Sequence, residues 1–338
     1  MINIKETLFE LSKVDAAGYV SEARDLAYDK LCEYCECEKS DTLNVFGYLK
    51  GESDYTVMLD AHIDQIAFIV TDVDDNGFLT VSNVGGIDLR QLPSRRVTIH
   101  GRQKVTGVFV STPPHLSSGE KEYSDITAIK IDTALGSCAK DIISVGDIVT
   151  FSTEPVSLIG DRVAGKSFDD RAGCAVLIEV AKRLCKEKLP VNVAFLLSDS
   201  EEIGQRGAKT AAFKVTPNEA VVVDVSFGDT PGISSDKTGD LAKGAMIGIS
   251  PRLDKGMSKK LISVAKDKNI PYQIEVMARD SGTNADVIAT TKTGVKTATV
   301  SIPLRNMHTD CEILSISDLE NTVTLLCEYI RNGGVKNV

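Results

Sequence analysis

The fold is constrained most by a regular alternation of apolar and amphipathic segments between Gly160 and the C-terminus. Residues 191–198 (VNVAFLLS) are almost entirely apolar, which is typical of a strand covered on both faces. Residues 170–187 instead repeat apolar side chains at helical spacing. The pattern then predicts a helix at 204–213, a strand at 219–226, a helix at 256–268, a strand at 272–277, a helix at 283–290, a strand at 295–301 and a helix at 316–332. This order predicts an α/β domain with a largely parallel sheet.

Residues 66–153 have a different sequence pattern, in which short β-forming runs are separated by turn residues and no long helix is predicted. Such a segment is typical of a small barrel or β-sandwich. Helices at 4–13 and 20–36 and strands at 42–49 and 55–60 precede it. The simplest architecture is an α/β domain formed by residues 1–68 and 160–338, with a β-rich domain inserted at 69–159.

Composition and charge argue against nucleic-acid binding, a membrane span and a signal peptide. The 338 residues carry a net charge of -10 and no basic stripe, which argues against binding to nucleic acid. No segment approaches the roughly 18 apolar residues that a membrane span needs. Charged residues interrupt the first 18 positions, so we expect no signal peptide and a cytoplasmic location.

The eight cysteines are expected to stay reduced in such a chain. Cys32, Cys35 and Cys37 lie close together, and a C-x2-C-x-C run can bind metal. No second Cys or His pair follows at the spacing of a zinc finger, so partly buried thiols near a helix end are the favoured interpretation.

His62 and Asp64 follow an apolar strand and alternate onto one side of the chain. A metal-binding imidazole needs an acceptor at its other ring nitrogen, and Asp64 could supply it. An H-x-D pair alone is weak evidence, because a histidine in a core or on a surface gives the same pattern.

Two adjacent aspartates, Asp169 and Asp170, open the predicted helix at 170–187. A helix N-cap needs one carboxylate, whereas this turn has two, followed by Arg171, which could neutralise one of them. The two oxygens of one aspartate can bridge cations roughly 3.5–4 Å apart, as in two-metal hydrolases.

Two adjacent glutamates, Glu201 and Glu202, follow the apolar strand at 191–198. Successive side chains diverge at a strand end, so one can ligate a metal while the other faces a substrate water. Asp224 lies inside an apolar strand, where a carboxylate is costly without a cation. His308 follows the strand at 295–301, and residues beyond strand carboxyl ends line the ligand crevice of α/β sheets.

Together these segments resemble the M42 family of metallo-aminopeptidases, the glutamyl or deblocking aminopeptidases of the tetrahedral-assembly type. The matching stretches are DAHIDQIAF, GKSFDDRAGCAV, SDSEEIGQRGA, VDVSFGDTPG and SIPLRNMHTDCE, in the family's order. The tract at 107–116 is similar to the family's inserted PDZ-like β domain.

The resemblance implies two divalent metal ions per chain, zinc or cobalt, with manganese as a further possibility. The implied ligands are His62 and Asp224 for one metal, Glu202 and His308 for the other, and Asp169 as the bridge. Glu201 would be the general base for attack by a metal-bound hydroxide. Asp64 and Asp170 would support the ligands, and the Asp169–Asp170 peptide is expected to be cis.

The resemblance also implies short peptides as substrates and a homo-oligomer, with a hollow dodecamer as the family's frequent form. Four positions depart from the family pattern: Gln65, Ala67, Asn284 and Asn306. None is an implied ligand, so they bear on substrate preference and on the surroundings of the site. His100 and His115 match no ligand position and are interpreted as ordinary residues of the β-rich segment.

Other functions are compatible with parts of this pattern. A metal-dependent deacylase or amidohydrolase of small N-acyl compounds would use the same metals. A glycoside hydrolase needs two opposed carboxylates and normally no metal, which fits adjacent Glu201 and Glu202 poorly. A non-catalytic assembly or binding protein could keep the fold, but it would have no need of all six implied residues.

Overall fold

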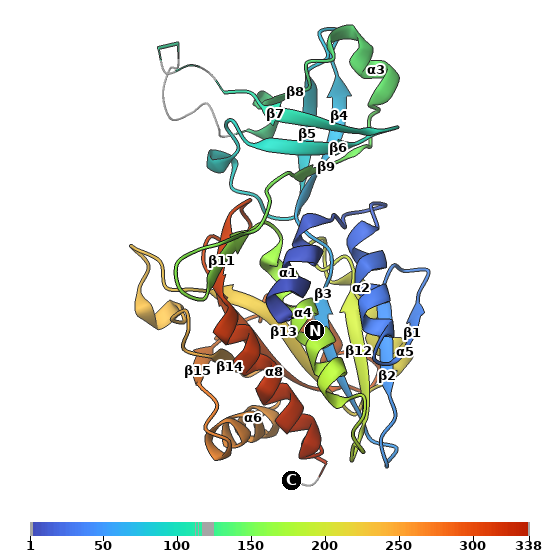
Figure 1. The fold of residues 1–338 in the computed structure, drawn as a ribbon, viewed down its shortest axis with the longest axis vertical. Helices are drawn as coiled ribbons and strands as arrows, with labels where there is room; N and C mark the ends of the chain where they lie inside the picture. The colour runs from blue at the N-terminus through green and yellow to red at the C-terminus, as the bar shows by residue number, and fades with distance from the viewer. Residues whose placement is uncertain (1–2, 112, 114, 117–124, 337–338) are drawn as a thin grey trace.

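The computed structural model describes residues 3–111, 113, 115–116 and 125–336. A closed β-barrel lies above a larger part in which helices flank an extended sheet (Figure 1). The chain enters the barrel after β3 (Thr56–His62) and leaves it after β9 (Ile148–Phe151). In the described residues, no helix is both long and apolar enough to cross a membrane.

The larger part is built on an eight-stranded mixed sheet. Its strands, in spatial order, are β1 (Glu36–Lys39), β2 (Val45–Leu49), β12 (Asn192–Ser198), β3, β13 (Glu219–Phe227), β16 (Lys296–Leu304), β14 (Ala245–Ile249) and β15 (Tyr272–Val276). The four central strands β12, β3, β13 and β16 are mutually parallel, as predicted. Antiparallel pairs at β1–β2, β2–β12 and β16–β14 make the sheet mixed toward both edges.

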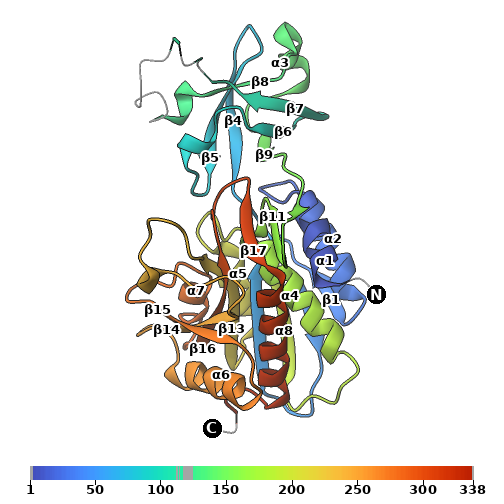
Figure 2. The same ribbon diagram turned by 60° about the vertical axis from the view of Figure 1, so that its left-hand side comes forward.

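Helices cover both faces of this sheet. The main core lies between one face and α1 (Ile4–Lys13), α2 (Glu22–Cys32), α4 (Phe168–Leu184), α6 (Lys255–Asp267) and α8 (Ile316–Arg331). The opposite face packs against α5 (Arg206–Val215) and α7 (Ala285–Ile288). Figure 2 shows α4 and α8 side by side over the sheet. Burial on both faces explains why the central strands read as continuous apolar runs.

The barrel contains six strands in the closed order β4 (Ala67–Val73), β5 (Leu79–Val84), β8 (Lys130–Asp132), β7 (Lys104–Phe109), β6 (Arg96–His100) and β9. Its core includes Phe68, packed edge-to-face against Phe109 and Phe151. The short helix α3 (Ala139–Ile142) and 3-10 turns at Leu89–Gln91, Ile126–Ala128 and Gly136–Cys138 complete it. The predicted small β-structure is therefore a barrel.

The finer predictions for this region remain predictions. The barrel does not by itself confirm a PDZ-like fold, and residues 112 and 114 of the 107–116 tract lie outside the described residues. The boundaries at 69 and 159 are likewise untested. A separate three-stranded sheet of β10 (Val156–Ser157), β11 (Arg162–Gly165) and β17 (Glu312–Ser315) follows the barrel.

Several element boundaries differ from the prediction. The helix predicted at 20–36 ends at Cys32, because residues 36–39 pair with β2 as an antiparallel edge strand. The helix predicted at 283–290 shrinks to α7, a single turn. Strands β14 and β17 were not predicted, since each is a short run whose pairing partner is distant in sequence. Tertiary pairing decides such short segments more than local preference does.

Candidate metal centre

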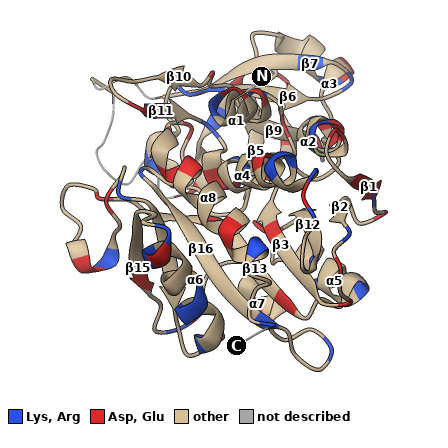
Figure 3. Ribbon diagram, turned by 60° about the horizontal axis from the view of Figure 1, so that its bottom comes forward, with Lys and Arg blue, Asp and Glu red and all other residues tan. Residues whose placement is uncertain are grey.

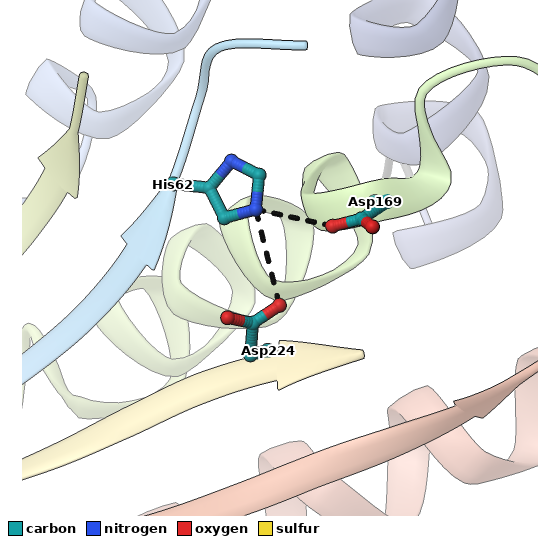
Figure 4. Close-up of side chains that lie close together, drawn as sticks. All are labelled: His62, Asp169 and Asp224. Atoms are coloured by element: carbon teal, nitrogen blue, oxygen red, sulfur yellow. Dashed lines mark hydrogen bonds and ion pairs between the residues drawn. The ribbon is translucent and has the colours of Figure 1, made fainter. Parts of the chain in front are cut away.

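His62, Asp169 and Asp224 form the first group of side chains that could hold a metal ion. They come from the end of β3, the start of α4 and the middle of β13, and they point toward one another (Figure 4). The Nε2 atom of His62 lies 3.1 Å from Oδ1 of Asp169 and 3.9 Å from Oδ1 of Asp224. All three residues are buried.

Asp169, Glu202 and His308 form the second group. The Nε2 atom of His308 lies 3.3 Å from Oδ2 of Asp169 and 3.4 Å from Oε1 of Glu202. Asp169 thus turns one carboxylate oxygen to each imidazole. The structure brings together all five residues that the sequence suggested as ligands.

The strand order explains why segments so distant in sequence meet. Strands β12 and β13 flank β3 in parallel, with Ser198 of β12 opposite His62. Glu201 and Glu202 follow β12 directly, while His308 follows β16, the next strand beyond β13. All of these side chains therefore gather at the carboxyl ends of parallel strands, the usual place for a ligand site in an α/β sheet.

Asp64 links the two sides of the site. Its carboxylate accepts hydrogen bonds from the backbone N–H groups of Glu201, at 3.0 Å, and of Glu202, at 3.3 Å. Nδ1 of His62 lies 3.1 Å from the backbone oxygen of Asp64, so that ring nitrogen is held by an acceptor. This contact fits the supporting position suggested for Asp64, although the acceptor at the shorter distance is its backbone oxygen.

Asp170 follows the bridging candidate Asp169 and is fully buried. Its carboxylate accepts hydrogen bonds from the backbone N–H of His62, at 3.2 Å, and of Gly173, at 2.9 Å. The Asp169–Asp170 peptide bond is cis, as the resemblance implied. Arg171 does not pair with either aspartate as the sequence suggested; its guanidinium donates to the backbone oxygen of Ile63 and to Gln65 instead.

Glu201 lines the same cavity of about 140 Å³ as the five ligand candidates. It belongs to neither group of potential ligands. Its Oε1 accepts a hydrogen bond from Nε2 of Gln205 at 3.2 Å, and burial raises its pKa. A carboxylate held beside a cation site without ligating it is suited to accept a proton.

The electrostatics of the cavity favour a cation. Burial and the charge of Asp169 raise the pKa of Glu202 to about 8. Burial alone would lower the pKa of His308, but Asp169 and Glu202 raise it to about 9. Because carboxylates outnumber imidazoles in this cavity, a bound cation would relieve their mutual repulsion.

Glu312 is a part of the site that the sequence reasoning missed. Its Oε2 accepts a hydrogen bond from the backbone N–H of Asp169 at 3.1 Å, and its Oε1 accepts one from that of His308 at 2.9 Å. The residue is 1% exposed. An acidic residue four positions after His308 was the available signal, but its partners are backbone groups that no sequence pattern marks.

The remaining histidines lie outside both groups. His100 is buried, with Nε2 3.0 Å from Oγ1 of Thr150 and 3.4 Å from Oδ2 of Asp15, and His115 is exposed. The Sγ atoms of Cys35 and Cys37 lie 3.8 Å apart, but among the described residues no potential metal-binding group includes a cysteine. Cys32, Cys35 and Cys37 are half-buried thiols at and just after the end of α2, as interpreted, and the assignment of His100 and His115 as ordinary residues of the β-rich segment stays a prediction.

Comparison with known proteins places the chain in a family. The sequence profile described as M42 glutamyl aminopeptidase matches residues 44–325. A putative aminopeptidase of Acetivibrio thermocellus is 33% identical over 96% of this chain and 99% of its own length. A protein of Pyrococcus furiosus named lysyl aminopeptidase is 31% identical over 89% of each chain.

The solved structures agree with the sequence relatives. A TET1 peptidase of Pyrococcus horikoshii, which can assemble into a tetrahedron or a large octahedral shell, superposes with a TM-score of 0.86. It is 28% identical, and the match covers 97% of this chain and 99% of the other. The chain therefore belongs to the M42 glutamyl aminopeptidase family and is an aminopeptidase, a hydrolase of peptide bonds.

Proposed function

We propose that the protein removes N-terminal residues from short peptides with two metal ions, held on either side of Asp169. The observation that carries this proposal is the shared carboxylate: Oδ1 of Asp169 faces His62 and Oδ2 faces His308. His62 and Asp224 would complete one site, and Glu202 and His308 the other. A bridging aspartate of this kind is typical of two-metal hydrolases.

The ligand atoms suit borderline divalent cations. Imidazole nitrogen and carboxylate oxygen bind zinc and cobalt well, and manganese is also compatible. Such ions supply Lewis acidity, which polarises the scissile carbonyl and makes water more acidic. Asp64 and Asp170 would hold His62, Glu201 and Glu202 in place through the hydrogen bonds described above.

Glu201 would act as the general base. It would take a proton from the attacking water and pass it to the leaving amine. Burial raises its pKa, which makes the carboxylate a better proton acceptor in the first step. Its contact with Gln205 fixes the side chain at the edge of the cavity.

The wider assembly is also a proposal. The TET1 peptidase can assemble into a tetrahedron or a large octahedral shell, and a TET1 structure holds a dodecamer, so we infer that this chain forms a homo-oligomer, with a dodecamer as the expected form. The barrel would be an inserted PDZ-like domain at 69–159, and the cytoplasm remains the location predicted from sequence. Basic and acidic residues are interspersed in the view of Figure 3, and we propose no nucleic-acid partner.

Two variants separate the roles of base and ligand. Glu201→Gln should lower kcat by about 10²–10⁴-fold, because it removes the proton acceptor, while metal content stays at two ions per chain. His308→Ala should instead lower the metal content measured by elemental analysis. Glu36→Gln, an exposed change on the edge strand β1, controls for the loss of one carboxylate.

The substrates in this experiment decide between the alternatives. Aminoacyl p-nitroanilides test for an aminopeptidase, and N-acetyl amino acids test for the deacylase that the sequence left open. A Glu201→Gln protein with wild-type turnover would exclude Glu201 as the base. Hydrolysis of N-acetyl amino acids alone would exclude the aminopeptidase proposal.

A further inference from the structure

A second cavity, of about 460 Å³, opens beside the metal centre. Two chain segments line both spaces: Val225 and Gly282 border the metal centre, while Ser226 and Ser281, their direct neighbours, border the second cavity. Side chains two residues apart on a strand point to the same face about 6.6 Å apart, so Ser226 lies on the face that carries Asp224. The two cavities are therefore lined by adjacent residues of the same two segments.

The walls of this cavity are mostly apolar. Its larger apolar side chains are Phe227, Ile233, Met246, Ile274, Val276 and Met277. Phe227, Ile233 and Val276 are at least half exposed. Among the described residues, none covers this apolar surface of the cavity. Such walls suit the hydrocarbon part of a side chain.

One carboxylate stands in these apolar surroundings. Glu275 of β15 is half-buried and accepts hydrogen bonds from the hydroxyl groups of Ser226 and of Ser301, the second at 2.7 Å. Ser301 is opposite Asp224 in the pairing of β13 with β16, so these hydroxyls connect Glu275 to the metal-centre face of the sheet. The carboxylate is thus fixed in position by two serine hydroxyl groups.

Of the three acids that line the cavity, Glu275 is the one that is half-buried, whereas Asp236 and Asp280 are exposed. Asp280 pairs with Arg252 at 2.6 Å. No Lys, Arg or His among the described residues forms an ion pair with Glu275. Burial raises its pKa, which a cationic ligand would reverse.

We propose that this cavity receives the side chain of the substrate's N-terminal residue and that Glu275 selects a basic one, lysine or arginine. Those side chains combine a long hydrocarbon stem with a cationic tip, which matches apolar walls and a half-buried carboxylate that forms no ion pair. The proposal rests on the aminopeptidase function above and names the substrate class of that same site. Glu275 is a specificity-determining residue and takes no part in the chemistry.

The test compares lysyl with norleucyl p-nitroanilide, because norleucine has the same four-carbon stem without the ammonium group. A hydrogen bond to a charged partner implies that wild-type kcat/KM for the lysyl substrate exceeds that for the norleucyl one by about 10–100-fold. Glu275→Gln keeps the shape and the serine contacts but removes the charge, so this ratio should fall toward one. Glu36→Gln, at the opposite edge of the sheet, should keep the wild-type ratio.

Each outcome bears on the proposal separately from the proposed function. Equal wild-type rates for the two substrates, as expected if a second copy of the chain fills the cavity, would overturn it. So would an unchanged ratio in a folded, metal-loaded Glu275→Gln protein. If no anilide is hydrolysed, the proposed function fails. Calorimetry then tests the inference by comparing the binding of L-lysinamide and L-norleucinamide to the wild type. Equal affinities overturn the inference, and tighter binding of L-lysinamide supports it.

Discussion

Replacing Glu312 by glutamine tests how the two halves of the metal centre are held in register. The glutamate accepts one hydrogen bond from the backbone N–H of Asp169 and one from that of His308. A glutamine of the same shape offers one oxygen and one NH₂ group, so one backbone N–H faces another donor. Glu312→Gln therefore disturbs two proposed ligands without touching either side chain.

The magnitude follows from those two hydrogen bonds. An unsatisfied buried donor costs about 1–3 kcal/mol, and we expect a loss of that size in the free energy of unfolding. Loss of a group that orients metal ligands typically lowers metal affinity about 10–100-fold. The second range corresponds to about 1.4–2.8 kcal/mol, so the two expected effects agree in size.

Metal affinity would be measured by competition with a chelator, and stability by denaturant unfolding of the metal-free protein. Glu219→Gln is the matched control, because Glu219 is equally buried but binds Tyr55 and Tyr329 at the other end of β13. It should affect stability alone. Wild-type metal affinity in Glu312→Gln, or an equal loss in Glu219→Gln, would refute the positioning role.

Two further predictions concern the whole molecule. Asp15→Asn leaves the buried Lys166 without its partner at 2.7 Å, so the free energy of unfolding at pH 7 should fall by about 3–5 kcal/mol in denaturant melts. Burial raises the pKa of Asp15, but Lys166 and His100 lower it below 3.8; the stabilisation is therefore present above pH 3.8 and lost as the pH falls further, and the variant should converge on the wild type there. Light scattering should give a mass several times that of one chain, and a monomer would contradict the proposed assembly.

The side chains whose proximity could be predicted from sequence are those with a local sequence pattern. His62 ends an apolar strand, Glu202 and His308 each follow one, and parallel strands bring such ends to one edge of the sheet. The central strands were predictable for the same reason. Asp169 and Asp224 stand out because acids at a buried helix start or inside an apolar strand require partners.

The features that sequence missed depend on contacts between distant segments. Strand β14 becomes a strand by pairing antiparallel with β16, and β17 by pairing with β11. Arg171 was expected to be a counter-ion for its neighbours. Instead, its buried guanidinium donates to the backbone oxygens of Leu11 and Val14, at the end of α1, where the last carbonyl groups have no partner within the helix. In both cases the deciding partner lies far along the chain, where local pattern carries no information.

The two halves of the metal centre also depend on different parts of the fold. His62 and Asp224 belong to the central sheet alone, whereas His308 contacts the barrel: its backbone oxygen accepts a hydrogen bond from Gln91 at 2.8 Å. A Cβ atom added at Gly86 would lie 3.1 Å from Nδ1 of His308. The barrel thus packs directly against one imidazole of the site and leaves the other to the sheet.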